Sequence, residues 1–397
     1  MKHTFLLAAF FSVFVSCSDS KKLFVVEAIN SPAGSISAEP YLFTDPLGAI
    51  HLTWIERVDT INYLKLSHWQ NEAWSEPVVI TSGSDWFVNW ADYPLLVSDG
   101  KGKFIAHILK KSGEGTFAYD VAVAHSSDGT AWSEPTVLHD DGKQAEHGFV
   151  SFVPYAENVF VSWLDGRNTV GDEPTDHDDH GHHGEMTVRA AVLSYDGNKL
   201  NEWELDSRVC DCCQTTSAIT TNGPVVIYRD RSETEIRDMS IVRLVNDTWT
   251  EPKPIFSDQW EISGCPVNGP RCEAIGNTLA VAWFTMANEK PAASVIFSDD
   301  GGETFNQPIQ LNKSEEAIGR VDLVLLNEQT AVVSWMEGTN IHVAQVTKDG
   351  NVERVSVLAE SSESRSSGFP QLTKGDGFIM AAWTDAEAKT VRTAKLK

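Results

Sequence analysis

Short apolar stretches separated by polar turns recur along almost the whole chain. Each unit has two such stretches around a tight turn that carries Gly or Asn, and the second stretch ends in an aromatic residue or His. This pattern is typical of β-hairpins. Seven units are present, with their end positions 48 to 65 residues apart. These positions are Trp54, His107, Trp163, Tyr228, Trp283, Trp335 and Trp383.

A repeat of this length is typical of propeller blades. We therefore predict an all-β protein, a seven-bladed β-propeller forming one domain over residues 23–397. Six blades, with one unit misassigned, is the alternative. The last unit ends at Lys397 after only three strands. Residues 23–29 (LFVVEAI) are predicted to supply the fourth strand, which would close the ring and remove an open sheet edge.

The N-terminus has the features of an export signal. Residues 5–15 are apolar, too few to span a membrane as a mature helix, and Ser16-Cys17 follows. Residues 14–17 (FVSC) resemble a bacterial lipobox, with Phe where Leu is usual. We predict a signal peptide at 1–17, lipidation of Cys17, a tether at 18–22 and anchoring in the outer membrane or at the cell surface. The alternative is plain secretion with Cys17 discarded.

Charge and composition exclude some partners. The formal net charge is −25, which argues against nucleic acid and against adsorption to anionic lipid surfaces. An apolar content of 42% with 13 Trp and 18 Phe indicates a packed core. The acidic excess is interpreted as a solvated exterior.

A second repeated motif lies between the predicted third and fourth strands of several units. Residues 298–305 (SDDGGETF) match Ser-x-Asp-x-Gly-x-Thr-Trp/Phe in full, and residues 126–132 (SSDGTAW) are one residue short. The Asp accepts turn amides and Gly takes positive φ, so we interpret the motif as a folding device. The motif resembles that of the Asp-box, sialidase-like β-propeller family.

The resemblance implies a known set of catalytic groups. Sialidases hold a substrate carboxylate with three arginines, use a Tyr–Glu pair as nucleophile and an Asp as acid/base. Their first-blade Arg-Ile-Pro is absent here, where residues 38–40 read Ala-Glu-Pro. Tyr228, Asp230 and Glu233 are the catalytic candidates, although no motif assigns those roles. Residues 209–238 and 264–273 also resemble uncharacterised bacterial sialidase-like lipoproteins.

Propeller geometry predicts that most charged and potentially metal-binding side chains lie on one face of the ring. The loops that precede each first strand and those between second and third strands share a face, here called the loop face, and the Asp boxes lie opposite. Five arginines fall on the loop face of an acidic chain, which favours an anionic ligand. For two of them, Arg229 and Arg231, an ion-pair network with neighbouring carboxylates is equally open. The five are Arg167, Arg229, Arg231, Arg271 and Arg320.

Five cysteines precede the first strands of units four and five, so we expect them to lie near one another. Two disulfides with one thiol left over is one interpretation in an oxidising compartment. A soft-metal site for copper or zinc is the other, and both can hold together. The five are Cys210, Cys212, Cys213, Cys265 and Cys272.

A His-rich insertion, residues 176–183 (DHDDHGHH), follows the second strand of unit three. Imidazole and carboxylate are metal ligands near neutral pH, so metal binding is predicted. A flexible polar loop is the alternative. The candidate histidines are His147, His177, His180, His182 and His183.

Three functions therefore remain open. The first is recognition or processing of an anionic glycan, which if catalytic would be sialidase-like hydrolysis. The second is copper or zinc binding through Cys and His. The third is a non-catalytic scaffold for protein interaction, since propellers host unrelated functions.

Overall fold

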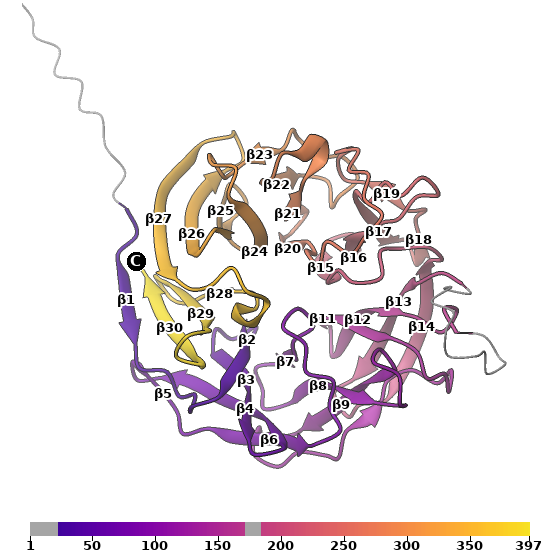
Figure 1. Ribbon diagram of the computed structural model, residues 1–397, viewed down its shortest axis with the longest axis vertical. Coiled ribbons are helices and arrows are strands. Elements are labelled where there is room, and N and C mark those ends of the chain that lie inside the picture. Colours follow the sequence, from indigo (N-terminus) through magenta and orange to yellow (C-terminus); the bar gives the residue numbers. More distant parts are fainter. Residues whose placement is uncertain (1–22, 171–183) are drawn as a thin grey trace, which may run out of the picture.

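The computed structural model describes residues 23–170 and 184–397 and shows a ring of seven β-sheets (Figure 1). Each sheet is antiparallel. In the first six sheets the strands follow one another in sequence from the centre of the ring outwards, whereas the seventh takes its outermost strand from the N-terminal part of the chain. The prediction of an all-β, seven-bladed propeller is confirmed. No helix in the described part of the chain is long and apolar enough to cross a membrane. Residues 1–17 and Cys17 lie outside the described residues, so the lipid anchor stays a prediction.

The blades are numbered along the chain. Blade 1 contains β2 (Ser37–Thr44), β3 (Ile50–Val58), β4 (Ile61–Gln70), β5 (Ala73–Trp74) and β6 (Val78–Gly83). Blade 2 contains β7 (Leu96–Ser98), β8 (Phe104–Lys111), β9 (Tyr119–Ser126) and β10 (Thr136–Val137). Blade 3 contains β11 (His147–Tyr155), β12 (Asn158–Asp165), β13 (Thr187–Ser194) and β14 (Lys199–Asp206). Blade 4 contains β15 (Thr216–Thr220), β16 (Gly223–Arg229), β17 (Met239–Val245), β18 (Thr248–Trp249) and β19 (Lys253–Pro254).

The remaining blades complete the ring. Blade 5 contains β20 (Arg271–Ile275), β21 (Thr278–Thr285), β22 (Ala292–Ser298) and β23 (Ile309–Gln310). Blade 6 contains β24 (Ala317–Asn327), β25 (Thr330–Glu337), β26 (Asn340–Thr347) and β27 (Val352–Glu360). Blade 7 contains β28 (Gln371–Lys374), β29 (Ile379–Asp385), β30 (Thr390–Leu396) and, as its outermost strand, β1 (Val26–Ile29). Two short 3-10 turns are η1 (Ala287–Glu289) and η2 (Arg365–Ser367).

The two ends of the described chain close the ring. Strand β1 pairs antiparallel with β30, with Val26 opposite Leu396 and Ile29 opposite Thr393. Two further backbone hydrogen bonds, 3.0 and 3.1 Å long, join Val25 to Lys397. In Figure 1 the indigo N-terminal strand lies beside the yellow C-terminal one. The predicted closure is thus confirmed.

The aromatic residues that mark the repeating units lie in the second strands and are part of the core. Trp54, Trp163, Trp283 and Trp335 are among the largest fully buried side chains. A buried indole N–H needs an acceptor, and a carboxylate two residues further on supplies it in three of these blades. Trp54 Nε1 donates to Glu56 Oε2 at 3.3 Å. Trp163 Nε1 donates to Asp165 Oδ2 at 2.8 Å, and Trp335 Nε1 donates to Glu337 Oε1 at 2.7 Å.

The complete Asp box stabilises its own turn. The Ser298 hydroxyl accepts the Gly302 N–H at 2.9 Å, and Asp300 Oδ1 accepts the Thr304 N–H at 2.8 Å. Although partial burial opposes ionisation, the hydrogen bonds from Thr304 lower the pKa of Asp300 to about 2. All of these bonds are internal to the turn, as a folding device requires.

Three innermost strands carry the same irregularity. The pairing register shifts between Ala38 and Tyr41 in β2, and at the corresponding places in β11 and β24. Each bulge holds a non-glycine residue at positive φ: Glu39 at 52°, Phe149 at 53° and Arg320 at 54°. Such conformations are uncommon, and β-bulges often re-aim a side chain next to a functional site.

The innermost strands surround a central channel of about 770 Å³, whose wall includes Arg271, Glu273 and Asp322. On the loop face, segments that precede the first strands meet across the axis. Gln214 donates to the Ala91 carbonyl at 2.5 Å and accepts the Gly269 N–H at 2.7 Å. These contacts link the segments before blades 2, 4 and 5, so the loop face is held by long-range bonds as well as by the sheets.

Removal of residues 1–29 should destabilise the ring, whereas removal of residues 1–22 should not. The longer deletion loses the backbone hydrogen bonds of β1, each with a net value of about 1 kcal/mol, and exposes the edge of β30. We expect a loss of several kcal/mol in the free energy of unfolding and a tendency to aggregate. Chemical denaturation and light scattering measure the two effects, and equal stability of the two truncations would contradict the proposed closure.

Candidate functional site

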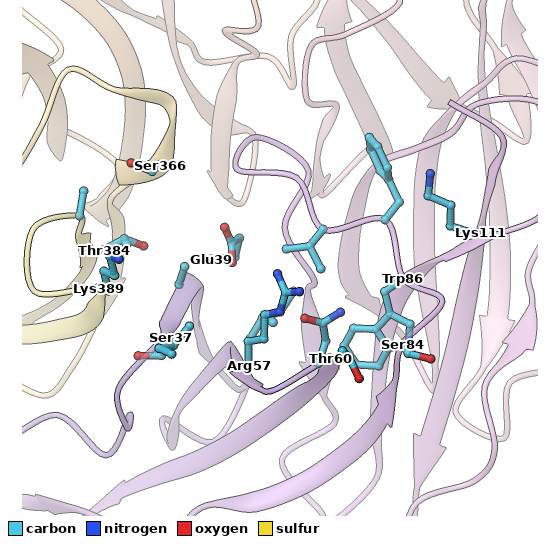
Figure 2. A pocket seen from close by; sticks show the side chains of 17 residues that line it. Ser37, Glu39, Arg57, Thr60, Ser84, Trp86, Lys111, Ser366, Thr384 and Lys389 are labelled. Atoms are coloured by element: carbon cyan, nitrogen blue, oxygen red, sulfur yellow. The ribbon is translucent and has the colours of Figure 1, made fainter. Parts of the chain in front are cut away.

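A cavity of about 610 Å³ opens on the loop face between blades 7, 1 and 2. Its lining comes from the start of β2, the loop between β3 and β4, the segment before β7, the end of β8 and the loop between β29 and β30. Figure 2 shows side chains from these segments around one open space, with Glu39 near its centre. Its size is in the range of small-molecule sites.

Glu39 is the most unusual group in this cavity. The bulge of β2 places it there, it is half-buried, and no hydrogen bond or ion pair reaches its carboxyl from the described residues. Burial alone raises its pKa to about 7. A carboxyl perturbed in this way within a concave site is a candidate functional group.

Three cationic side chains stand around the cavity: Arg57, Lys111 and Lys389. All three are exposed, and within the described ranges none forms an ion pair. Arg57 Nε donates only to the carbonyl of Asp59 at 3.1 Å, which leaves the rest of its guanidinium for a ligand. In a chain of net charge −25, this group favours an anion.

Sequence reasoning missed this site. Residues 38–40 attracted notice only because they depart from Arg-Ile-Pro, and none of the predicted ligand arginines lines the cavity. The available signal was a charged residue before Pro40 inside an apolar innermost strand. The lysines gave no signal, because exposed lysines are common on any surface.

Two of the predicted ligand arginines are buried and bound to the main chain. Arg229 is 1% exposed, and its guanidinium donates to the carbonyls of Arg237, Asn268 and Phe284 at 2.7 to 2.9 Å. Arg320 donates to three carbonyls of the segment before β28, and burial lowers its pKa to about 10. Both therefore join neighbouring segments of the loop face.

The other three arginines each lie beside a carboxylate. Arg167 Nε and Nη2 donate to both oxygens of Asp165 at 2.8 and 2.7 Å. Arg231 binds Glu235 at 2.9 Å, and Arg271 Nε lies 3.7 Å from an oxygen of Asp322 in the channel wall. The structure thus distributes the five arginines over separate places and does not bring them together.

The catalytic candidates are near one another in sequence but differ in environment. The Tyr228 hydroxyl donates to Asp206 Oδ2 at 2.7 Å, and burial holds its pKa well above the ordinary value. Asp230 accepts the Ser240 hydroxyl at 2.9 Å, and burial raises its pKa. Glu233 is exposed, and among the described residues no hydrogen bond joins it to Tyr228. Their catalytic roles stay predictions.

Three of the predicted thiols gather at the segment before blade 4. Cys210 Sγ lies 3.7 Å from Cys213 Sγ and 4.0 Å from Cys212 Sγ, and no disulfide joins the cysteines that the structure describes. The thiols of Cys212 and Cys213 and the nearby Arg237 hold the pKa of Cys210 well below its usual range. Cys265 approaches Cys212.

Cys272 lies apart from this thiol group. Its Sγ contacts Thr216 Oγ1 at 3.4 Å beside the central channel. His147 contacts His139, carboxylates and two main-chain carbonyls. The His-rich insertion at 176–183 falls outside the described residues. The structure thus contains groups of Cys, His and Asp that could hold a metal.

No family model and no curated protein matches the chain. Solved structures with a similar fold include an ulvan lyase described as a polysaccharide lyase of a new family, with TM-score 0.53, 13% identity and 81% of each chain covered. Another is a sialidase from Streptococcus pneumoniae, with TM-score 0.45 and 12% identity, where the match covers 95% of this chain and 71% of the sialidase. A third is an α-L-arabinanase from Penicillium chrysogenum, with TM-score 0.48 and 10% identity, where the match covers 94% of this chain and 97% of the arabinanase. At such identities the likeness to the lyase shows the fold alone.

Replacement of Arg229 should separate a structural role from a ligand role. Arg229→Ala leaves buried carbonyls without donors, so we expect a loss of about 3 kcal/mol or more in the free energy of unfolding. Arg231→Ala, which removes a partly exposed ion pair, should cost less than about 1 kcal/mol. Urea denaturation gives both values. A stable Arg229→Ala protein that has lost ligand binding would reverse the assignment.

Proposed function

We propose that this protein is a glycan-recognising propeller that binds an anionic saccharide in the cavity around Glu39. The observation that carries the proposal is a carboxyl inside a cavity bordered by three cations, where neither the carboxyl nor the cations form an ion pair with any residue that the structure describes. The cell envelope is the compartment that the N-terminal sequence predicts for it.

The chemistry of the lining supports a charged, polyhydroxylated ligand. Arg57 offers a planar fork that suits a carboxylate or sulfate, and the lysines add positive charge. Trp86 and Phe87 supply apolar surface beside these groups. Ligand cavities typically combine aromatic walls with a few placed polar groups in this way.

The same carboxyl could act in catalysis. A general acid or base works best when its pKa is near the working pH, and the pKa of Glu39 is about 7. Glu39 is therefore the candidate acid/base if the bound glycan is cleaved. We propose recognition as the primary function and cleavage at this residue as its extension.

Binding should depend on pH through Glu39. Below pH 7 the carboxyl is neutral, and above it the carboxylate repels an anion, so affinity should fall as pH rises through about 7. A repulsion of about 1.4 kcal/mol gives roughly a tenfold loss. Calorimetric titration with acidic oligosaccharides measures it. The panel should include ulvan fragments, because a propeller of this fold is an ulvan lyase.

Two cavity variants and one control variant make this test specific. Glu39→Gln should remove the pH dependence and abolish any cleavage, while Glu134→Gln, at an exposed position away from the cavity, should change neither. Arg57→Ala should weaken binding at every pH. No binding to any acidic glycan, or binding unaffected by both cavity variants, would refute the proposal. Binding without product release would restrict the function to recognition.

A second candidate function is soft-metal binding at Cys210, Cys212 and Cys213. Their sulfur atoms lie close together, and the lowered pKa of Cys210 provides the thiolate that a metal requires. Thiolates select Cu(I) and Zn²⁺, which are the metals we propose there. This candidate is independent of the Glu39 cavity.

Untagged protein purified under reducing conditions should contain copper or zinc at the thiol group. Cys210→Ser should lose this metal, because it removes the thiolate, and Cys272→Ser should keep it, since Cys272 lies outside the group. Elemental analysis together with thiol titration provides the measurement. A metal-free protein whose thiols are all titratable, or linked as disulfides, would exclude the site.

A further inference from the structure

A second buried group of ligand-type side chains lies where blades 2 and 3 meet. Asp120 belongs to β9 of blade 2, and His139 and Asp141 belong to the segment that leaves this blade. His147 begins β11, and Asp165 ends β12, both in blade 3. The side chains of both histidines and of Asp165 are at most 2% exposed. None of these residues lines the Glu39 cavity.

The two imidazoles are arranged around one carboxylate. Their rings are parallel, with centroids 3.6 Å apart and an interplanar angle of 10°. Asp141 Oδ2 lies 2.9 Å from His139 Nδ1 and 3.1 Å from His147 Nε2. Asp165 Oδ1 lies 3.6 Å from the same His147 nitrogen. Asp141, His147 and Asp165 thus form one group of mutually close ligand atoms, and His139 adjoins this group through Asp141.

The surroundings of His147 set its tautomer. Its Nδ1 lies 3.2 Å from the carbonyls of Tyr119 and Ala145, and a carbonyl can only accept a hydrogen bond. The proton is therefore on Nδ1, and Nε2 faces the carboxylates. Metal-binding histidines have this arrangement, with one nitrogen donating to a carbonyl or carboxylate and the other free for the ion.

His139 supplies the observation that an ion-pair network does not explain. Both of its ring nitrogens are buried, and neither has a hydrogen-bond partner in the described structure. Its Nδ1 approaches Asp141 to 2.9 Å without the geometry of a hydrogen bond. A buried polar group left unsatisfied costs about 1–3 kcal/mol, whereas a cation shared by this nitrogen and the carboxylate would satisfy both.

The charges also require a cation. Three carboxylates meet here: Asp141 and Asp165 lie 3.3 and 2.7 Å from the guanidinium of Arg167, and Asp120 lies 3.5 Å from His139 Nε2. In the described part of the chain, Arg167 is the only Arg or Lys that forms an ion pair with any of the three. Protonation of His147 would supply one positive charge, yet one negative charge would remain and His139 would still lack a partner. Uncompensated charge is costly at such a buried place. A divalent ion would balance the group with neutral imidazoles.

We propose that His139 Nδ1, His147 Nε2, Asp141 and Asp165 bind one divalent transition-metal ion. Nitrogen and oxygen ligands in this ratio suit Zn²⁺ and related ions more than Cu(I), so the site differs in chemistry from the thiol group. The ion would join the segment leaving blade 2 to the first two strands of blade 3. Arg167, held by the second oxygen of Asp165, would then orient a ligand carboxylate.

Zinc binding should follow His139 and Asp141. Untagged protein dialysed against Zn²⁺ should hold a zinc ion that protects it from thermal unfolding, and EDTA should remove this protection. His139→Ala and Asp141→Asn should weaken the affinity by at least about tenfold, the lower limit seen even for outer ligand partners. His125→Ala, on the same strand β9 as Asp120 but outside the group, should bind as the unmodified protein does.

Two further measurements distinguish this site from other places on the chain. Cobalt substitution should give visible d–d bands that Asp141→Asn removes, and in the Cys210→Ser protein these bands should persist without the near-ultraviolet charge-transfer band that thiolates add. A variant with Ala at His177, His180, His182 and His183 should keep the protective zinc. Zinc protection unchanged in His139→Ala and Asp141→Asn, or its absence from the unmodified protein, would overturn the proposal. The cobalt spectrum of the Cys210→Ser protein decides the matter if either variant fails to fold.

Discussion

The pairing of β1 with β30 is the constraint on which the rest of the molecule depends. In a ring of blades, each sheet packs mainly against its two neighbours, so an open ring would leave one sheet face and one sheet edge uncovered. The four residues of β1 cover the edge of β30 and join positions as distant in sequence as Val26 and Leu396. Every loop on the loop face is therefore held by a frame that is complete only when both chain ends are in place.

The Glu39 cavity lies at this seam. Its lining combines residues 36–39, from the beginning of the described chain, with Ser366, Thr384 and Lys389 from its end. Backbone contacts cross the same boundary: the Ser37 N–H donates to the carbonyl of Lys389 at 3.1 Å, and the Ser37 hydroxyl accepts the Val391 N–H at 3.1 Å. Ring closure and formation of the cavity are thus one event, which couples the stability of the fold to its capacity to bind.

The fold was predictable because aromatic residues recur at a regular spacing in the sequence. The site was not, because it depends on which side chains become buried and on what they contact. The recurrence of residues such as Trp163 and Trp335 reports blade number directly, because each blade needs one large side chain in its core. Arg229 looked like a ligand residue because it follows an apolar strand, yet its donors all go to main-chain carbonyls that no sequence pattern reveals. Glu39 looked unremarkable because its environment is formed by several segments that are far apart in the sequence.

The same limit applied to the metal-type groups. Local density of Cys in residues 210–213 predicted a cluster, and three of the thiols do lie together. His139 and Asp141 come from an interval without enrichment and meet His147 only through the packing of blade 2 against blade 3. Local enrichment of Cys in the sequence therefore predicted the thiol group, which one segment forms. It did not predict the group around His139, which several segments form.

The bulges of β2, β11 and β24 have a wider meaning for this architecture. One backbone conformation occurs three times around the ring, and it carries an acid in blade 1, an aromatic ring in blade 3 and a base in blade 6. The bulge thus fixes where the side chain is placed, while the type of residue at that place differs from blade to blade. Divergence among such propellers could proceed by exchange of single residues at these points, with the blades themselves left intact.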